Sequence, residues 1–269
     1  MTGLRCRAIA TVAGLAALLT GLVLGGCAAP PTGGDEIRTA SDQSDGEKRA
    51  RVRLELASAY FGRGQANTAL DEVKQALAAK PDLPEAFNLR GLIYASLGEV
   101  KLAEDSFKRA LQLRAKDVDT LHNYGWFLCQ LRRYDEAEAQ FQLALAQPQY
   151  LDAPRSLFAL GVCQARRGRW AEAEASLSRS YELDPANPGT ALNLSEVLYR
   201  RGEYERARFY IRRVNAVSEQ SNAQSLWLAA RIERRLGNMA GVGDFGRQLR
   251  DRFPDSTEAL RYQRGQFDE

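Results

Sequence analysis

Hydrophobic and polar positions recur with a helical period from about residue 50 to the end of the chain. Residues 91–111, GLIYASLGEVKLAEDSFKRAL, and residues 125–145, GWFLCQLRRYDEAEAQFQLAL, place apolar side chains three and four positions apart with charged side chains between them. This spacing predicts amphipathic helices that each bury one face. A turn in the middle of each stretch, such as that at Gly98, divides the stretch into two helices. We therefore expect a series of helical hairpins.

The hairpins repeat at a period of about 34 residues. Each unit has a small residue within its first helix, and these residues are Ala57, Gly91, Gly125, Gly161, Ser195 and Ala230. The pattern resembles the tetratricopeptide repeat, in six units at residues 50–83, 84–117, 118–153, 154–187, 188–222 and 223–256. The resemblance implies an all-α fold, a right-handed solenoid of six helix-turn-helix repeats. The sixth unit is the weakest, because Gly241, Gly243 and Gly246 dilute its second helix. Residues 257–269 are expected to form a short, solvent-facing C-terminal capping helix.

The start of the chain has the features of a secretory signal. Arg5 and Arg7 precede an apolar run, and Leu24-Gly25-Gly26-Cys27 ends the segment 1–26. This ending resembles the lipobox of bacterial lipoproteins, which implies cleavage before Cys27 and acylation of its sulfur. Ala28 stands where aspartate commonly signals retention at the inner membrane, so we expect a periplasm-facing lipid anchor in the outer membrane; a retained, uncleaved anchor is the alternative.

Residues 27–49 are rich in Pro, Gly, Ser and charge, which predicts a flexible tether between this lipidated cysteine and the repeats.

One side of the first helix of each repeat is predicted to bind a partner. His122, Trp126 and Cys129 stand at positions i, i+4 and i+7, so they share one side of a helix. In tetratricopeptide proteins this side lines the concave groove. With their counterparts we call them the A-helix row: Leu54, Phe61, Leu92, His122, Trp126, Cys129, Phe158, Val162, Leu192, Tyr199 and Trp227. A contiguous apolar surface with aromatic side chains favours protein binding. Single members could instead pack between neighbouring helices.

Other chemistries fit the sequence less well. His122 and Cys129 lie about 10 Å apart along one helix, too far for a base and its nucleophile. One histidine and the thiols of Cys129 and Cys163 do not supply a metal site, so no metal or other cofactor is expected, nor a small-molecule substrate. A disulfide between the two cysteines is an open alternative, although their unlike positions in adjacent repeats argue against it. With 37 Lys and Arg against 34 Asp and Glu, the charge balance argues against nucleic acid as a partner.

A narrower resemblance appears in the third repeat. Residues 121–141, LHNYGWFLCQLRRYDEAEAQF, together with the lipobox, the six repeats and the terminal segment LRDRFPDSTEALRYQRGQF at 249–267, resemble the PilF/PilW family of type IV pilus biogenesis lipoproteins. The resemblance implies a pilotin, a non-enzymatic outer-membrane lipoprotein that binds secretin subunits and promotes their localisation and multimerisation. An adaptor or scaffold for another envelope assembly, such as barrel assembly or a protease, is the alternative. An envelope enzyme is a further alternative, for which no catalytic constellation is present in the sequence.

Overall fold

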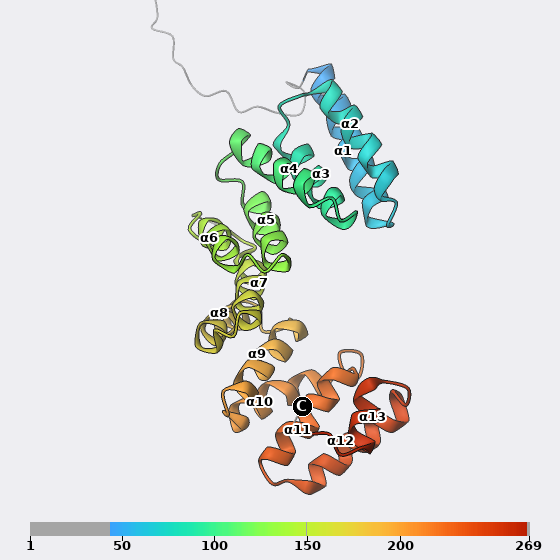
Figure 1. Ribbon diagram of the computed structural model, residues 1–269, viewed down its shortest axis with the longest axis vertical. Helices are drawn as coiled ribbons and strands as arrows, with labels where there is room; N and C mark the ends of the chain where they lie inside the picture. Colours follow the sequence, from blue (N-terminus) through green and yellow to red (C-terminus); the bar gives the residue numbers. More distant parts are fainter. Residues whose placement is uncertain (1–43, 149, 268–269) are drawn as a thin grey trace, which may run out of the picture. The chain divides into compact units, whose positions relative to one another are not determined.

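The computed structural model describes residues 44–148 and 150–267 (Figure 1). The predicted signal peptide at 1–26, the acylation site Cys27 and the predicted tether as far as residue 43 lie outside the described residues. The helices of the described part are α1 (Asp45–Gly62), α2 (Ala66–Ala79), α3 (Pro84–Ser96), α4 (Val100–Leu113), α5 (Val118–Gln130), α6 (Tyr134–Leu145), α7 (Ala153–Arg166), α8 (Trp170–Leu183), α9 (Pro188–Arg200), α10 (Tyr204–Asn215), α11 (Ala223–Arg235), α12 (Met239–Arg252) and α13 (Thr257–Gln263).

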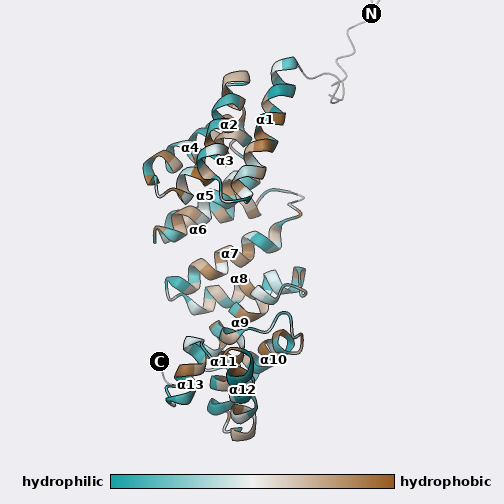
Figure 2. Ribbon diagram, turned by 90° about the vertical axis from the view of Figure 1, so that its right-hand side faces the viewer, coloured by the Kyte–Doolittle hydropathy of each residue, from teal (hydrophilic) through white to brown (hydrophobic). Residues whose placement is uncertain are grey.

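The first twelve helices form six hairpins, which we call repeats one to six. Within each hairpin the first helix, A, packs along the second, B, and B also contacts the A helix of the next repeat. The A helices of consecutive repeats contact each other as well, from α1 to α11. Hydrophobic and hydrophilic residues both occur along most of the helices (Figure 2). The predicted all-α fold of helix-turn-helix repeats is confirmed.

Small residues allow the two helices of a hairpin to approach closely. A methyl group added at Gly91 would come within 2.7 Å of the Phe107 ring, so a larger residue there would force the helices apart. On the B helix, Ala103 is fully buried beside this contact. The same arrangement recurs where Gly125 faces Phe141. The small and bulky residues of the repeat pattern therefore fill the core of each hairpin.

The turns between the A and B helices need a left-handed backbone conformation. Five of the six are made by glycines with φ between 75° and 83°: Gly64, Gly98, Gly168, Gly202 and Gly237. The turn of the third repeat uses Arg132 instead, at φ 61°. This conformation is unfavourable for a residue with a Cβ atom.

The first helix begins earlier than predicted. α1 starts at Asp45, whereas the flexible tether was expected to reach residue 49. Ser44 accepts a hydrogen bond from the Glu47 amide, and the Glu47 side chain accepts one from the Ser44 amide. This capping box satisfies two amide groups that a helix start leaves unpaired. Among the described helices, none is both long and apolar enough to cross a bilayer.

The C-terminal segment packs inward, which corrects the expectation of a solvent-facing cap. Phe267 is 6% exposed, and its ring centroid lies 4.9 Å from that of Trp227 on α11. The Tyr262 ring occupies the space that a side chain at Gly246 would fill. Gly246 is therefore needed in α12 as the contact point for α13, and it is not simply a weakness of the sixth repeat.

Candidate binding surface

The A-helix row is partly accessible over most of its length. Eight of its members are half-buried: Leu54, Phe61, Leu92, Trp126, Phe158, Val162, Leu192 and Tyr199. Several also pack against the buried clusters of their own repeats, as Leu54 and Phe61 do in the first repeat. Each such side chain is held from one side by the core and keeps its other side accessible. Three predicted members, His122, Cys129 and Trp227, are buried instead.

His122 connects the third and fourth repeats. Its Nδ1 lies 2.8 Å from the Ser156 hydroxyl oxygen on α7, which in turn lies 2.8 Å from the Tyr150 hydroxyl. The side chain is 6% exposed. Burial lowers the pKa of His122 to about 4, with the charge of Arg155 acting in the same direction. His122 is therefore a neutral structural group at neutral pH, and its predicted place on the binding surface is wrong.

Cys129 and Cys163 form a disulfide between α5 and α7, with a Cα–Cα distance of 5.8 Å. The sequence argument against this bond is therefore wrong. Comparing equivalent positions of two repeats does not reveal which positions of adjacent A helices touch, and the bond depends on this contact. Both cysteines are buried and covalently paired, so Cys129 belongs to the buried cluster against which Trp126 packs and is not available to a partner.

The segment around Asn123 ties three consecutive repeats together. Its side chain accepts a hydrogen bond from Arg155 at 3.2 Å and donates one to Asn88 at 3.1 Å. Next to it, the Tyr124 hydroxyl donates to Glu104 at 3.1 Å, and Arg133 donates to both oxygens of the same carboxylate. The Arg133 guanidinium is the main reason that the pKa of Glu104 falls to about 2. These residues hold the A helices in register.

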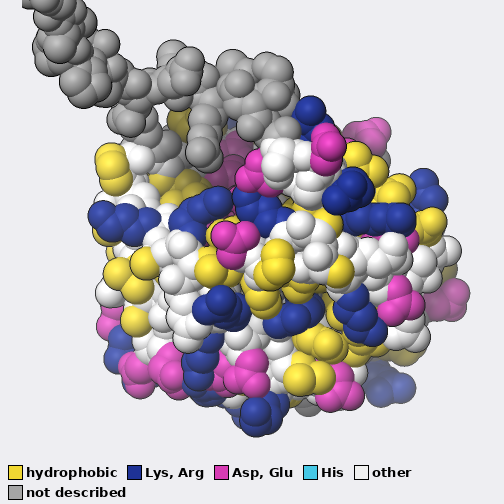
Figure 3. Space-filling model, turned by 90° about the horizontal axis from the view of Figure 1, so that it is seen from above, with side chains coloured by type: hydrophobic (Ala, Val, Ile, Leu, Met, Phe, Trp, Pro, Cys, Tyr) yellow, Lys and Arg dark blue, Asp and Glu magenta, His cyan; other side chains and the backbone are white. Residues whose placement is uncertain are grey.

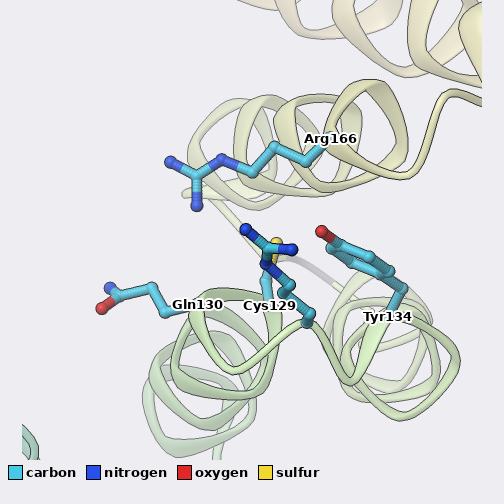
Figure 4. A pocket seen from close by; sticks show the side chains of 5 residues that line it. Cys129, Gln130, Tyr134 and Arg166 are labelled. Carbon is cyan, nitrogen blue, oxygen red and sulfur yellow. The ribbon is translucent and has the colours of Figure 1, made fainter.

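A cavity opens beside Trp126, at the turn end of the third and fourth A helices. It measures about 470 Å³ and is lined by Cys129, Gln130, Arg132, Tyr134 and Arg166. In Figure 4 the side chains of Gln130, Tyr134 and Arg166 surround the same space. The Arg166 guanidinium also lies 5.1 Å from the centre of the Trp126 ring, in a cation–π contact. Arg166 therefore both lines the cavity and contacts Trp126 of the A-helix row.

Arg132 and Arg166 were not among the predicted site residues. A signal for Arg132 was present, since it stands in the turn position where the other repeats have glycine. Arg166 had no such signal, because only the structure shows that it reaches across to the third repeat. Among the described residues, no group of three His, Cys, Asp or Glu side chains could hold a metal ion.

The C-terminal end of the row is filled by the chain itself. Trp227 is 4% exposed beneath Phe267, so it is not available to a partner, and the prediction for this residue is wrong. Arg231 lies 4.7 Å from the centre of the Tyr199 ring and donates a hydrogen bond to Glu196 at 2.8 Å. The accessible apolar positions therefore belong mainly to the first four repeats.

The surface near the N-terminal end is mixed in character. On the face shown in Figure 3, hydrophobic side chains alternate with lysines, arginines and acidic side chains. A partner that covers this part of the molecule would therefore meet charged groups beside apolar ones. Such a mixture is common at interfaces between proteins that also exist apart.

The sequence and the fold have clear relatives. A sequence model of the tetratricopeptide repeat matches residues 54–118 and 128–188, and a second such model matches 164–231. The type IV pilus assembly protein PilF of Pseudomonas aeruginosa is 28% identical over 253 residues, covering 94% of this chain and 98% of that protein. The solved structure of PilW, a widely conserved type IV pilus biogenesis factor, is 30% identical with a TM-score of 0.74, covering 80% of this chain and 98% of that chain. This chain belongs to the PilF/PilW family.

A second solved structure of this family gives a similar result. P. aeruginosa PilF superimposes with a TM-score of 0.73 at 25% identity, and the match covers 82% of this chain and all of that chain, 100%. The resemblance inferred from the third repeat is confirmed. The protein is thus a tetratricopeptide repeat protein of type IV pilus biogenesis. The tetratricopeptide repeat fold is a scaffold that binds other proteins.

Proposed function

We propose that this PilF/PilW family protein is an outer-membrane lipoprotein that binds secretin subunits and promotes their localisation and multimerisation. The observation that carries the proposal is the series of half-buried apolar side chains along the A helices of the first four repeats. Family membership supplies the context of type IV pilus biogenesis. The secretin is the expected partner because the narrower resemblance implies a pilotin.

The A-helix row suits the binding of a polypeptide segment. Trp126, Phe158 and Leu92 each pack partly against buried neighbours, which restricts their rotamers before any partner arrives. A surface ordered in advance loses less side-chain entropy on binding than a mobile one. Burial of the remaining apolar area contributes about 25 cal/mol per Å² before other costs. A partner segment with apolar side chains at matching spacing would gain most.

The lipid anchor would place this surface where the secretin assembles. Each acyl CH₂ group that enters the bilayer contributes about 0.8 kcal/mol. An anchored protein that holds a secretin subunit raises the local concentration of that subunit at the membrane. Multimerisation would then be promoted without a chemical step.

The binding surface is tested by removing two of its aromatic side chains. We expect Phe61→Ala with Trp126→Ala to weaken capture of purified secretin subunits about tenfold or more, because aromatic anchors dominate such contacts. Phe209→Ala is the matched control, since Phe209 is 56% exposed on the B helix α10. Unchanged capture by the double variant would contradict the role of the row.

The anchor is tested separately with Cys27→Ala. We expect the variant to leave the membrane fraction and secretin rings to decline, measured as the heat-resistant multimer in membrane extracts. Normal ring formation would contradict the anchoring role. Capture of the lipidated protein from solubilised membranes without any secretin would favour an adaptor role in another envelope assembly.

A further inference from the structure

The cavity beside Trp126 gathers more positive charge than its own surroundings neutralise. Arg132 comes from the turn after α5 and Arg166 from the last residue of α7, and both line the cavity of about 470 Å³. The Tyr134 and Gln130 side chains add hydrogen-bonding groups at its wall (Figure 4). Two guanidinium groups beside a hydroxyl and an amide are suited to an anion.

The other arginines of this region are already neutralised. Arg133 pairs with Glu104 and Glu136, and Arg167 and Arg169 pair with Asp135 and Glu138. By contrast, no carboxylate of the described residues pairs with Arg132 or Arg166. Within residues 44–148 and 150–267, the Arg166 guanidinium lies over the Trp126 ring and forms no ion pair.

A comparison with the next repeat shows why Arg166 has no acidic neighbour. Arg200 occupies the equivalent position of α9, and its Nε donates to Glu196 at 2.9 Å, one helical turn earlier. In α7 the residue one turn before Arg166 is Val162. The fourth repeat thus keeps the arginine and replaces its intrahelical partner by an apolar residue. This substitution leaves the guanidinium available and adds an apolar side chain next to it.

Arg132 is held in an unfavourable backbone conformation. Its φ of 61° falls where five equivalent turns use glycine, so the fold itself does not require an arginine. Strained residues of this kind are typical of binding and catalytic sites. The strained turn places the Arg132 guanidinium at the wall of the cavity. A role in binding explains why an arginine stands at this position.

We propose that this cavity binds a side-chain carboxylate of an extended acidic segment of the protein partner, with an apolar neighbour of that carboxylate lying on Trp126 and Val162. Guanidinium groups bind carboxylates through paired, charge-assisted hydrogen bonds. The cavity is larger than an isolated carboxylate needs, and its Arg166 also contacts Trp126 of the A-helix row, so a longer polypeptide fits better than a small anion. The proposal adds the chemistry of the partner to the binding role proposed above and rests on that role.

The test is selection of ligands from a displayed library of random linear peptides with the purified full-length protein. We expect the selected peptides to share an Asp or Glu next to an aromatic or aliphatic residue. Replacing this acid by Asn or Gln, or combining Arg132→Gln with Arg166→Gln in the protein, should weaken binding about tenfold or more. Rising salt should weaken it further.

Arg200→Gln is the matched control, because it removes an equivalent arginine that has its own partner and should leave peptide affinity unchanged. Thermal unfolding of each variant checks that the fold is kept. Selected peptides without an acidic residue, or equal affinity for the double arginine variant, would overturn the proposal. Competition by inorganic phosphate at equal strength to the peptide would overturn it as well, because the cavity would then be a general anion site.

The same proteins separate this proposal from the proposed function. If acidic peptides bind through the two arginines while the wild-type protein captures no secretin, the cavity is supported and the secretin role is contradicted. If secretin capture is normal in the double arginine variant and peptide affinity is also unchanged, the secretin role stands and the proposal for the cavity is overturned.

Discussion

His122 shows how a single buried side chain can couple stability to pH. It is the only histidine of the chain and is held neutral between α5 and α7, with its pKa lowered to about 4. In the unfolded chain its pKa returns to about 6.5. Because the unfolded state then binds a proton that the folded state does not, the free energy of unfolding falls as pH drops from about 6.5 towards 4.

We therefore expect the free energy of unfolding to fall by about 1 kcal/mol between pH 7.5 and 5.5 from this residue alone. Urea unfolding at the two pH values measures the change. His122→Gln should remove most of it, since glutamine can still form a hydrogen bond with Ser156 but does not titrate. An equal pH dependence in the variant would show that other groups are responsible.

Arg132 lowers the stability of the fold, because its backbone is strained. We expect Arg132→Gly to raise the free energy of unfolding by about 0.5–1 kcal/mol, the balance of relieved strain and the greater freedom of unfolded glycine. Thermal or urea unfolding provides the measurement. The reverse comparison is Gly98→Ala at the equivalent turn, which should destabilise. A lower stability for Arg132→Gly would mean that the arginine side chain contributes more than its conformation costs.

At the residue scale the sequence predicted some roles and not others. The small residues Gly91 and Gly125 were identified correctly, because their role follows from a repeated local pattern. His122 and Cys129 were misplaced on an accessible surface. Their burial depends on contacts with Ser156 and Cys163 of the next repeat. The hydrophobic pattern of a single helix does not show which residues of another helix it contacts.

At the scale of helices, the disulfide between α5 and α7 fixes the junction of the third and fourth repeats. It joins cysteines separated by 34 positions in the sequence. A loop of this size predicts that the disulfide stabilises the fold by about 2–4 kcal/mol, through the restricted unfolded state. Urea unfolding with and without a reductant should show this loss.

Cys129→Ala with Cys163→Ala provides the control for that comparison. The double variant should start with the lower stability and should not respond to the reductant. A wild-type protein whose unfolding midpoint is the same under both conditions would contradict a stabilising role for the bond.

The C-terminal helix α13 and the residues after it seal the sixth repeat. We expect Phe267→Ala to lower the free energy of unfolding by about 2 kcal/mol, since it removes a buried ring from Trp227. In a background with Trp126→Phe and Trp170→Phe, the emission of Trp227 should shift to longer wavelength as water reaches the indole. Phe209→Ala on the exposed face of α10 should change neither property. An unshifted emission would mean that Trp227 stays covered without Phe267.

Helix boundaries show a similar division between local and distant causes. The start of α1 at Asp45 follows from the sequence Ser44-x-x-Glu47, so this local signal could have been found. The inward packing of α13 could not, because it depends on the Tyr262 ring meeting Gly246 on another helix. A glycine in a helix is expected to lower the stability of that helix. Its role in packing becomes visible only when the residue that contacts it is known.

At the scale of the whole molecule, the repeat pattern and the family membership both favour a protein that binds a partner along its A helices. The first five hairpins provide a row of half-buried apolar side chains, and the C-terminal segment covers the row at the sixth repeat. The sequence predicted the architecture because every repeat contains the same information. It did not predict how far the row stays open, because coverage of Trp227 comes from residues outside the repeats.

The central claim is that the A-helix row binds a secretin segment, and site-directed photo-crosslinking tests it most directly. A photoreactive phenylalanine analogue is placed at Trp126 in one protein and at Phe209 in another, and each is irradiated with secretin subunits. The account predicts a secretin adduct from position 126 and none from position 209. An adduct from position 209 alone, or none from position 126, would contradict it.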